Sequence, residues 1–385
     1  MSNFPEKLSQ KLVDRKTNNG LRSLPSISKL IDFSSNDYLG FAKNETIYAN
    51  TFQLLLNKGI SENGASGSRL LSGNHLLYRE LEEQITKFCN SESALVFNSG
   101  YDANIGFFSS VPQRGDVVFF DELIHASIRD GIKMGNAKNY KFKHNSLEDL
   151  KSKYHAERSR SPKESEFYLV TESVFSMDGD SPDLKAMAEF CKMEGIHLVV
   201  DEAHAIGVFG TDGRGLVCEL ALEKQIFARI ITFGKAIGCH GAAILGSTKL
   251  TAYLINFSRS FIYTTALPPH TVGSIISAYK FLTTSEAQKQ NILLKENITF
   301  FKKKLKSLKI EKHFIRSDSA IQSCILSGNN AVKSISKKLL KDGFDIKPIL
   351  SPTVSEGEER LRFCLHSFNT TEEIGWLLQQ LKTYL

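Results

Sequence analysis

The sequence predicts an α/β fold with a mainly parallel sheet in a large domain and a smaller α+β domain at the C-terminus. Short runs of β-branched residues and leucine, typical of strands buried on both faces, alternate with longer segments of helical periodicity. Strand–helix units in succession form parallel sheets with right-handed crossovers. Several runs end in polar residues, and ligands of such sheets bind at the carboxyl ends of the strands. We therefore expect the functional site at that edge.

Length and composition limit the class of protein. The chain has 385 residues, 41% hydrophobic and 23% charged, as in ordinary soluble enzymes. Its apolar runs are shorter than a membrane span, and the first residues lack the apolar core of a signal peptide, so we predict a cytoplasmic protein with no membrane partner. Six cysteines without C-x-x-C spacing indicate reduced, mostly buried thiols and no metal site.

The charge pattern gives a weak indication of partners. The net charge is +6, and its lysine runs interleave with leucine and isoleucine at helical spacing, which is typical of a solvated helix face. No motif supports a nucleic-acid partner. The excess positive charge favours an anionic partner, such as coenzyme A or an acidic acyl carrier protein.

The first third of the chain contains a helix, two loops and the first strands. Residues 1 to about 30 are expected to form an amphipathic helix and an extended arm that includes Arg22, followed by a short strand and a turn at 31–40 with Asn36. Serines and glycines over 64–75 indicate a tight loop, and apolar spacing over Leu76–Phe88 indicates a helix.

Two strand-to-helix junctions follow. The strand Ala94–Phe97 leads into a helix start at Gly100 and Tyr101, where free amides beside the positive end of the helix dipole suit a phosphate. A strand within 116–121 precedes His125, which either caps or packs at the next helix or stacks on an aromatic cofactor.

The middle of the chain predicts three more strands. Residues 148–166 are charged and irregular around 159–162, and we expect a surface excursion there. The strand 167–172 is followed by a loop with Ser176, a helix at 184–194 leads to the strand ending at Asp201, and the strand 227–233 leads to Lys235.

The remainder predicts the small domain. We expect helices over 271–308, 331–342 and 371–384 and strands over 321–326 and 361–365, so that the chain divides into an N-terminal segment 1–45, a large domain 46–270 and a small domain 271–385.

An acid, a histidine three residues later and a lysine one strand further on are the parts that a pyridoxal 5'-phosphate (PLP) site needs. Lys235 would form a Schiff base with the aldehyde, and Asp201 would keep the pyridine nitrogen protonated. The letters of 201–204 also match a helicase box, but the Gly-Lys pair at 234–235 is followed by alanine, so the phosphate loop of a helicase is missing. A lone lysine after a strand is usually solvated, and only its neighbours favour the cofactor.

Five ordered motifs resemble those of the α-oxoamine synthases, which are PLP-dependent transferases of fold type I, the aspartate aminotransferase-like fold. The similarity runs in register from about residue 30 to the C-terminus, and the loop at 68–75 looks most like that of the family's biotin-pathway member. The motifs are Asn36-Asp37-Tyr38-Leu39-Gly40, the loop 67–75, Thr171 to Asp180, Asp201-Glu202-Ala203-His204 and Thr232-Phe233-Gly234-Lys235-Ala236.

The resemblance implies a role for each matched position. Lys235, Asp201, His204 and His125 match catalytic residues: the Schiff-base lysine, the partner of the ring nitrogen, a donor to the phenolic oxygen and the ring stacked on the cofactor. Further positions match cofactor contacts, namely Ser176 and the phosphate-binding Gly100, Tyr101, Thr232 and, from the neighbouring subunit, Thr265 or Thr264. On the substrate side, Arg362 matches the residue that binds the amino acid carboxylate, for which a two-pronged guanidinium is suited, and Arg22, Asn36, His125 and Thr353 match other substrate positions.

The resemblance also implies the reaction. An amino acid, with L-alanine as our choice, condenses with an acyl thioester, with pimeloyl-CoA or a pimeloyl carrier protein as our choice, and loses carbon dioxide. A homodimer with shared sites is implied as well. Alternatives are a glycine-using member such as glycine C-acetyltransferase or 5-aminolevulinate synthase, a sphingolipid-type synthase, an aminotransferase of the same fold, or a catalytically silent partner subunit.

Overall fold

The computed structural model describes residues 4–22, 24 and 29–385, and part of the predicted N-terminal arm lies outside them. Residue contacts divide the chain into a larger unit, Asn36–Ser176 with Ser181–Ile292, and a smaller unit, Met1–Ser35 with Met177–Asp180 and Leu293–Leu385. The domain boundaries predicted from the sequence, at 46 and 271, differ from the boundaries of these units. The predicted domains remain a proposal.

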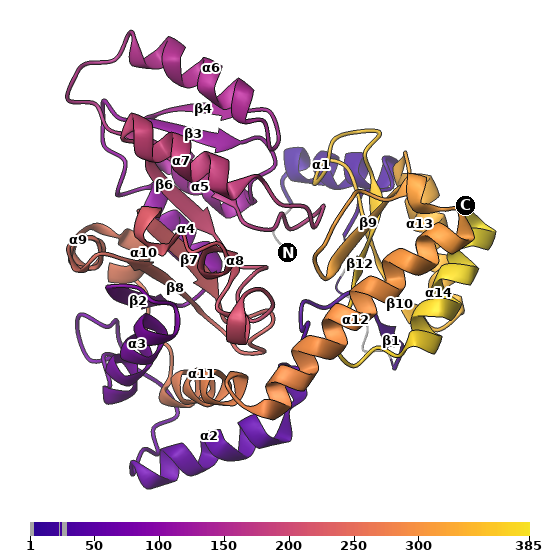
Figure 1. The fold of residues 1–385 in the computed structure, drawn as a ribbon, viewed down its shortest axis with the longest axis horizontal. Helices are drawn as coiled ribbons and strands as arrows, with labels where there is room; N and C mark the ends of the chain where they lie inside the picture. Colours follow the sequence, from indigo (N-terminus) through magenta and orange to yellow (C-terminus); the bar gives the residue numbers. More distant parts are fainter. Residues whose placement is uncertain (1–3, 23, 25–28) are drawn as a thin grey trace. The chain divides into compact units, whose positions relative to one another are not determined.

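The larger unit is built on a seven-stranded sheet, which confirms the predicted mainly parallel arrangement (Figure 1). Only β8 runs against its neighbours, pairing antiparallel with both β2 and β7. The order across the sheet is β2 (Ser93–Phe97), β8 (Ala242–Gly246), β7 (Ala228–Thr232), β6 (His197–Asp201), β5 (Phe167–Glu172), β3 (Val117–Asp121) and β4 (Lys138–Phe142).

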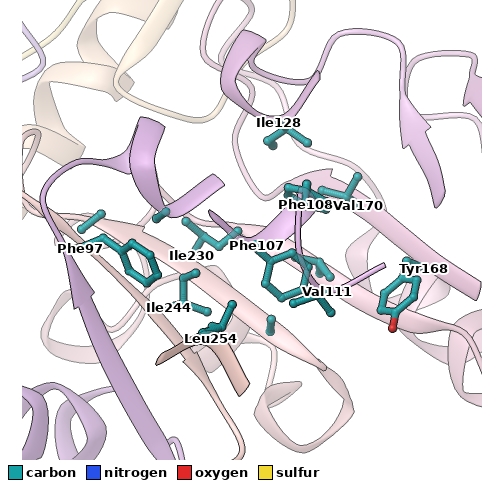
Figure 2. Close-up of a cluster of buried hydrophobic side chains, with 14 of the residues drawn as sticks. Phe97, Phe107, Phe108, Val111, Ile128, Tyr168, Val170, Ile230, Ile244 and Leu254 are labelled. Carbon is teal, nitrogen blue, oxygen red and sulfur yellow. The ribbon is translucent and has the colours of Figure 1, made fainter. Parts of the chain in front are cut away.

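Both faces of this sheet are buried except at the exposed edge strand β4, as the apolar strands predict. Side chains of a strand alternate between faces, so Tyr168 and Val170 pack on one side while Phe167 and Leu169 pack on the other. Figure 2 shows the first cluster, in which Phe107 and Phe108 lie with Ile230 and Ile244. The helices that contribute to this cluster are α4 (Gly100–Phe108), α5 (Ala126–Met134), α9 (Thr248–Phe257) and α10 (Arg259–Ile262).

The expected irregular segment around 159–162 consists of turns, but the second cluster shows that the residues before it form a helix packed on the sheet and not a surface excursion. This helix is α6 (Leu147–Arg158), capped by the Ser146 hydroxyl, which accepts a hydrogen bond from the Asp149 amide. Leu150 and Tyr154, one turn apart, are buried against the sheet and hold the helix there, although its other faces are charged. The same cluster includes residues of α7 (Leu184–Glu194) and α8 (Leu216–Glu219).

Three more helices complete the larger unit. α11 (Pro269–Leu282) packs on α2 (Glu45–Asn57) and α3 (Leu76–Phe88), at a position where a Cβ on Gly273 would lie 3.4 Å from Leu55. The predicted helical stretch 271–308 is therefore two helices, α11 and α12 (Ser285–Leu308).

The smaller unit is the predicted α+β arrangement. Its antiparallel sheet has the order β11 (Lys347–Ile349), β12 (Arg360–Cys364), β9 (Ile321–Ile325), and β1 (Ile31–Asp32) pairs parallel with β10 (Phe344–Asp345). Its helices are α1 (Glu6–Thr17), α13 (Asn329–Lys341), α14 (Thr371–Tyr384) and the later part of α12. Across the described residues of both units, no helix combines the length and apolarity that a membrane crossing requires.

A buried ion pair lies at the carboxyl end of β6 in the larger unit. Glu202 follows the last residue of β6, and Arg229 on β7 donates to it from both Nε (2.8 Å) and Nη2. The other Glu202 oxygen accepts the Val217 amide, and Arg229 also donates to the Cys89 carbonyl. Glu202 therefore ties the end of β6 to β7 and to α8.

Replacement of Arg229 by methionine should destabilise the protein by about 3–5 kcal/mol, because the Glu202 carboxylate would be left buried without its partner. Urea unfolding followed by circular dichroism measures this loss. The control is Arg79→Ala, which removes an exposed pair with Glu83 one helical turn away and should change the free energy of unfolding by less than about 1 kcal/mol. Equal effects of the two substitutions would contradict the importance of the buried pair.

Candidate active site

Six strands of the larger unit end at the same edge of the sheet, since β2, β7, β6, β5, β3 and β4 run in one direction. The turns after five of them carry the predicted site residues. Gly100 follows β2, His125 follows β3, Ser176 follows β5, His204 follows β6 and Lys235 follows β7, while Asp201 and Thr232 are the last residues of their strands. Residues more than 100 positions apart in the sequence therefore lie at the same edge of the sheet, because their strands run in the same direction.

Asp201 is buried and held by two donors. The Ala203 amide donates to Oδ1 at 2.9 Å, and the Asn104 side-chain amide donates to Oδ2 at 3.0 Å. Asn104 lies one turn into α4 and is itself buried. Two charge-assisted hydrogen bonds of this kind fix the direction of a carboxylate.

His125 is the N-cap residue of α5, and its Nδ1 lies 2.7 Å from the Ser127 hydroxyl. Its backbone amide donates to Glu172 at 2.6 Å. Desolvation lowers the pKa of His125, and the charge of Lys235 lowers it further. The charges of Asp201 and Asp130 oppose this shift. The capping that the sequence suggested and a site position are therefore both present in this residue.

Glu172, at the end of β5, is a buried carboxyl group that the sequence did not single out. Burial, with a further contribution from Asp201, raises its pKa to about 8, while Lys235 and hydrogen bonds from the backbone of His125 and Ser176 oppose this shift. Because Asp201 and Lys235 act on both Glu172 and His125, these four groups share one electrostatic environment.

Lys235 belongs to a chain of polar contacts. Its Nζ lies 2.6 Å from His204 Nε2, and His204 Nδ1 lies 2.7 Å from the hydroxyl of the buried Tyr38. The Tyr38 hydroxyl is also within 3.1 Å of the Asn36 side-chain oxygen. His204 is thus held at both ring nitrogens.

The N-terminus of α4 is open for an anion. Ser99 caps the helix by accepting the Asp102 amide at its hydroxyl and the Ala103 amide at its carbonyl. The first amides of a helix have no acceptor within the helix, which leaves those of Gly100 and Tyr101 at this end. Thr232 lies beside them, since a Cβ on Gly100 would be 3.8 Å from its hydroxyl oxygen.

Thr265 and Tyr101 are placed by other contacts. The Thr265 carbonyl and the Thr264 hydroxyl accept hydrogen bonds from the side-chain amide of Asn98, two residues before α4. The Tyr101 side chain is exposed and its hydroxyl donates to Asp130 at 2.8 Å.

The other predicted substrate residues belong to the smaller unit. Arg22 donates to the Thr353 hydroxyl at 2.9 Å, so two of the three are in contact. Arg362 is buried in the middle of β12, and its Nη1 lies 2.9 Å from Cys364 Sγ.

Four residues of the site were not predicted individually from the sequence, namely Tyr38, Asn104, Ser127 and Glu172. The signal for Glu172 was present, because it ends a buried strand as Asp201 does. Asn104 and Ser127 carry no such signal, since each becomes part of the site only through helix packing against the sheet.

Comparisons with known proteins identify the family of the chain. The family model for class I and II aminotransferases matches residues 28–381. An 8-amino-7-oxononanoate synthase from Emericella nidulans is 39% identical over 384 residues, covering 97% of this chain and 93% of the relative. A putative 8-amino-7-oxononanoate synthase from Halalkalibacterium halodurans is 36% identical, covering 91% and 86%.

Solved structures show the same fold. A serine palmitoyltransferase from S. paucimobilis with bound PLP and myriocin has a TM-score of 0.87 at 27% identity, covering 98% of this chain and 96% of its own. An 8-amino-7-oxononanoate synthase from Francisella tularensis has a TM-score of 0.76 at 30% identity, covering 92% and 97%.

The chain therefore belongs to the class I and II aminotransferase family and has its fold type I architecture. Within that family it is an α-oxoamine synthase, a PLP-dependent C-acyltransferase.

The residues present fit PLP. The cofactor needs an amine, an anion beside the ring nitrogen and a phosphate site. Lys235 could supply the amine, the buried and doubly held Asp201 the anion, and the first amides of α4 with Thr232 donors of the kind that bind phosphate.

The Glu172 carboxyl group predicts a pH dependence of stability in the cofactor-free protein. The unfolded chain releases this proton near pH 4.5, and the folded chain keeps it to about pH 8. The folded state binds more protons in this interval, so the free energy of unfolding should fall as pH rises from 5 to 8. Glu172→Gln should flatten this decline in urea unfolding measured across the interval. An equal slope in both proteins would show that Glu172 titrates normally.

Proposed function

We propose that the protein catalyses the decarboxylative condensation of L-alanine with a pimeloyl thioester, carried on coenzyme A or on a carrier protein. The products are 8-amino-7-oxononanoate, carbon dioxide and the free thiol, and the pathway is biotin biosynthesis. The observation that carries this proposal is the agreement of relatives named 8-amino-7-oxononanoate synthase over nearly the whole chain, together with a site whose residues fit the cofactor.

We assign the cofactor-holding residues as follows. Asp201 would face the ring nitrogen, His125 would cover one face of the ring, and His204 would bind the phenolic oxygen. Gly100, Tyr101 and Thr232 would bind the phosphate through the open end of α4, with Ser176 as a further contact and Thr265 reaching the neighbouring subunit's phosphate. Asp201, His125 and His204 all lie at one edge of the sheet, which supports these roles.

When bound, PLP supplies an aldehyde that captures amines and a ring that accepts the electron pair from a bond broken at Cα. Lys235 would hold the aldehyde in the resting enzyme and, once displaced by the amino acid, would remove and return the proton at Cα. Asp201 would keep the proton on the ring nitrogen, since a buried anion stabilises the positive form. The hydrogen bonds from Asn104 and Ala203 support this role by fixing the carboxylate before the reaction.

The substrate carboxylate would be bound by Arg362, whose guanidinium can form two parallel hydrogen bonds with it. Asn36, Arg22 and Thr353 would complete the substrate side. The contact between Arg22 and Thr353 supports a common role for that pair.

A second candidate function keeps the chemistry and changes the substrates. The solved serine palmitoyltransferase has a higher TM-score, 0.87, than the solved 8-amino-7-oxononanoate synthase, 0.76. This observation favours a sphingolipid-type synthase that joins an amino acid to a long-chain acyl thioester. The sequence identities favour the first candidate, because the Emericella nidulans relative is 39% identical and the palmitoyltransferase 27%.

We further propose a homodimer with shared active sites and a cytoplasmic location. Both rest on the family, and six cysteines present as thiols are compatible with a reducing compartment.

Substrate competition tests the proposed function. The purified protein with PLP should release free thiol fastest from pimeloyl-CoA with L-alanine, and mass spectrometry should detect 8-amino-7-oxononanoate. Glycine should react with kcat/KM about 10–100-fold lower, the discrimination that one methyl group can provide. Acetyl-CoA, succinyl-CoA and palmitoyl-CoA should react more slowly than the pimeloyl thioester.

The control is Lys235→Ala, which should be inactive with each pair. Preference for L-serine with palmitoyl-CoA would establish the second candidate instead. Preference for glycine with a short acyl group, or amino transfer to 2-oxoglutarate, would exclude both.

A further inference from the structure

His125 and Asp201, which lie 76 positions apart in the sequence, are joined by the buried polar side chains of Asn104 and Ser127. Asn104 Nδ2 lies 3.0 Å from Asp201 Oδ2 and 3.0 Å from the Ser127 hydroxyl, which in turn lies 2.7 Å from His125 Nδ1. Asn104, Ser127 and Asp201 are all buried, the first on α4, the second on α5 and the third at the end of β6.

The direction of each hydrogen bond in this chain can be assigned. The Asn104 atom facing the Asp201 carboxylate must be the nitrogen, because an amide oxygen there would meet a group that only accepts. That nitrogen has two protons, which are used by Asp201 and by the Ser127 oxygen. The Ser127 hydroxyl proton is then free to be donated to His125 Nδ1.

A second contact supports the same assignment at His125. The Ser127 backbone amide, which can only donate, lies 3.3 Å from His125 Nδ1. Nδ1 therefore accepts two hydrogen bonds and carries no proton, which places the proton of a neutral imidazole on Nε2. A charged imidazolium would need an acceptor at Nδ1, and the Ser127 backbone amide can only donate there.

The unpaired atom of Asn104 indicates why an amide is present. Its Oδ1 is buried and has no hydrogen-bond partner in the described part of the chain. A buried unpaired carbonyl is unfavourable, so the stability of this packing alone does not account for the residue. Its two donor protons, which are both used in hydrogen bonds, do account for the residue.

We propose that Asn104 is a positioning residue that acts through Asp201 and, by way of Ser127, through His125. It aims the carboxylate at the cofactor's ring nitrogen and keeps the stacking imidazole neutral, with its proton on Nε2. This inference rests on the proposed roles of Asp201 and His125. A neutral ring matters because a second positive charge beside a protonated pyridine would oppose the effect of Asp201.

The test substitutes Asn104 by leucine, which has a similar volume and no donors. PLP should bind to the cofactor-free protein with a dissociation constant about 10–100-fold higher, as expected for loss of a hydrogen bond to a charged group. In the cofactor-free protein labelled with ¹⁵N-histidine, the His125 Nδ1 signal should also shift, because Asn104 no longer directs the Ser127 hydroxyl as a donor. His125→Asn identifies its signals.

Asn297 provides a matched control. It is also a buried asparagine whose nitrogen makes two hydrogen bonds, to the carbonyls of His366 and Asn369 in the smaller unit. Asn297→Leu should lower stability and leave both the PLP dissociation constant and the His125 signals unchanged. This separates positioning from general loss of packing.

Ser127→Ala keeps the bond from Asn104 to Asp201 and removes the hydroxyl donor. It should change the His125 signals and raise the PLP dissociation constant by less than Asn104→Leu does. It also tests the chain if Asn104→Leu does not fold.

The outcomes distinguish this inference from the proposed function. Wild-type PLP affinity in Asn104→Leu, or unchanged His125 signals in Ser127→Ala, would overturn the inference. In both cases Asp201→Asn would still weaken PLP binding and alter the visible absorption band. If Asp201→Asn itself left affinity and absorption unchanged, the proposed role of Asp201 would fail, and the inference with it.

Discussion

The common direction of β2, β3, β5, β6 and β7 is the constraint on which the site depends. Parallel strands end at one edge, so residues that follow five separate strands lie there together. The same direction places the N-terminus of α4 at that edge, because the helix begins where β2 ends. Anion binding and amine chemistry are therefore brought together by topology.

Around this edge the protein retains buried polar groups whose partners come from neighbouring elements. Arg229 pairs with Glu202 beneath the end of β6, and Asn104 holds the carboxylate of the adjacent Asp201. Such groups are costly when unpaired and rigid when satisfied. In consequence, Asp201 and His125 are oriented before any ligand arrives, which is the condition under which a fixed charge contributes most to catalysis.

The apolar strands and the polar residues after them were sufficient to predict the mainly parallel sheet and the edge where Asp201, His204 and Lys235 meet. The matched motifs added the cofactor and the family. What could not be predicted depends on packing between elements: Leu150 and Tyr154 make α6 a buried helix despite its charge, and Asn104 and Ser127 reach His125 and Asp201 only because α4 and α5 pack side by side. How deeply a side chain is buried also could not be predicted, so the raised pKa of Glu172 could not be predicted from the sequence.

The central claim is that one amine at this edge, Lys235, holds the cofactor. The most direct measurement is borohydride reduction of the PLP-loaded protein, followed by proteolysis and mass spectrometry of the peptides. The account predicts one phosphopyridoxyl group per chain, on the peptide that contains Lys235. Its attachment to any other lysine, or none at all in protein that binds PLP, would contradict the account.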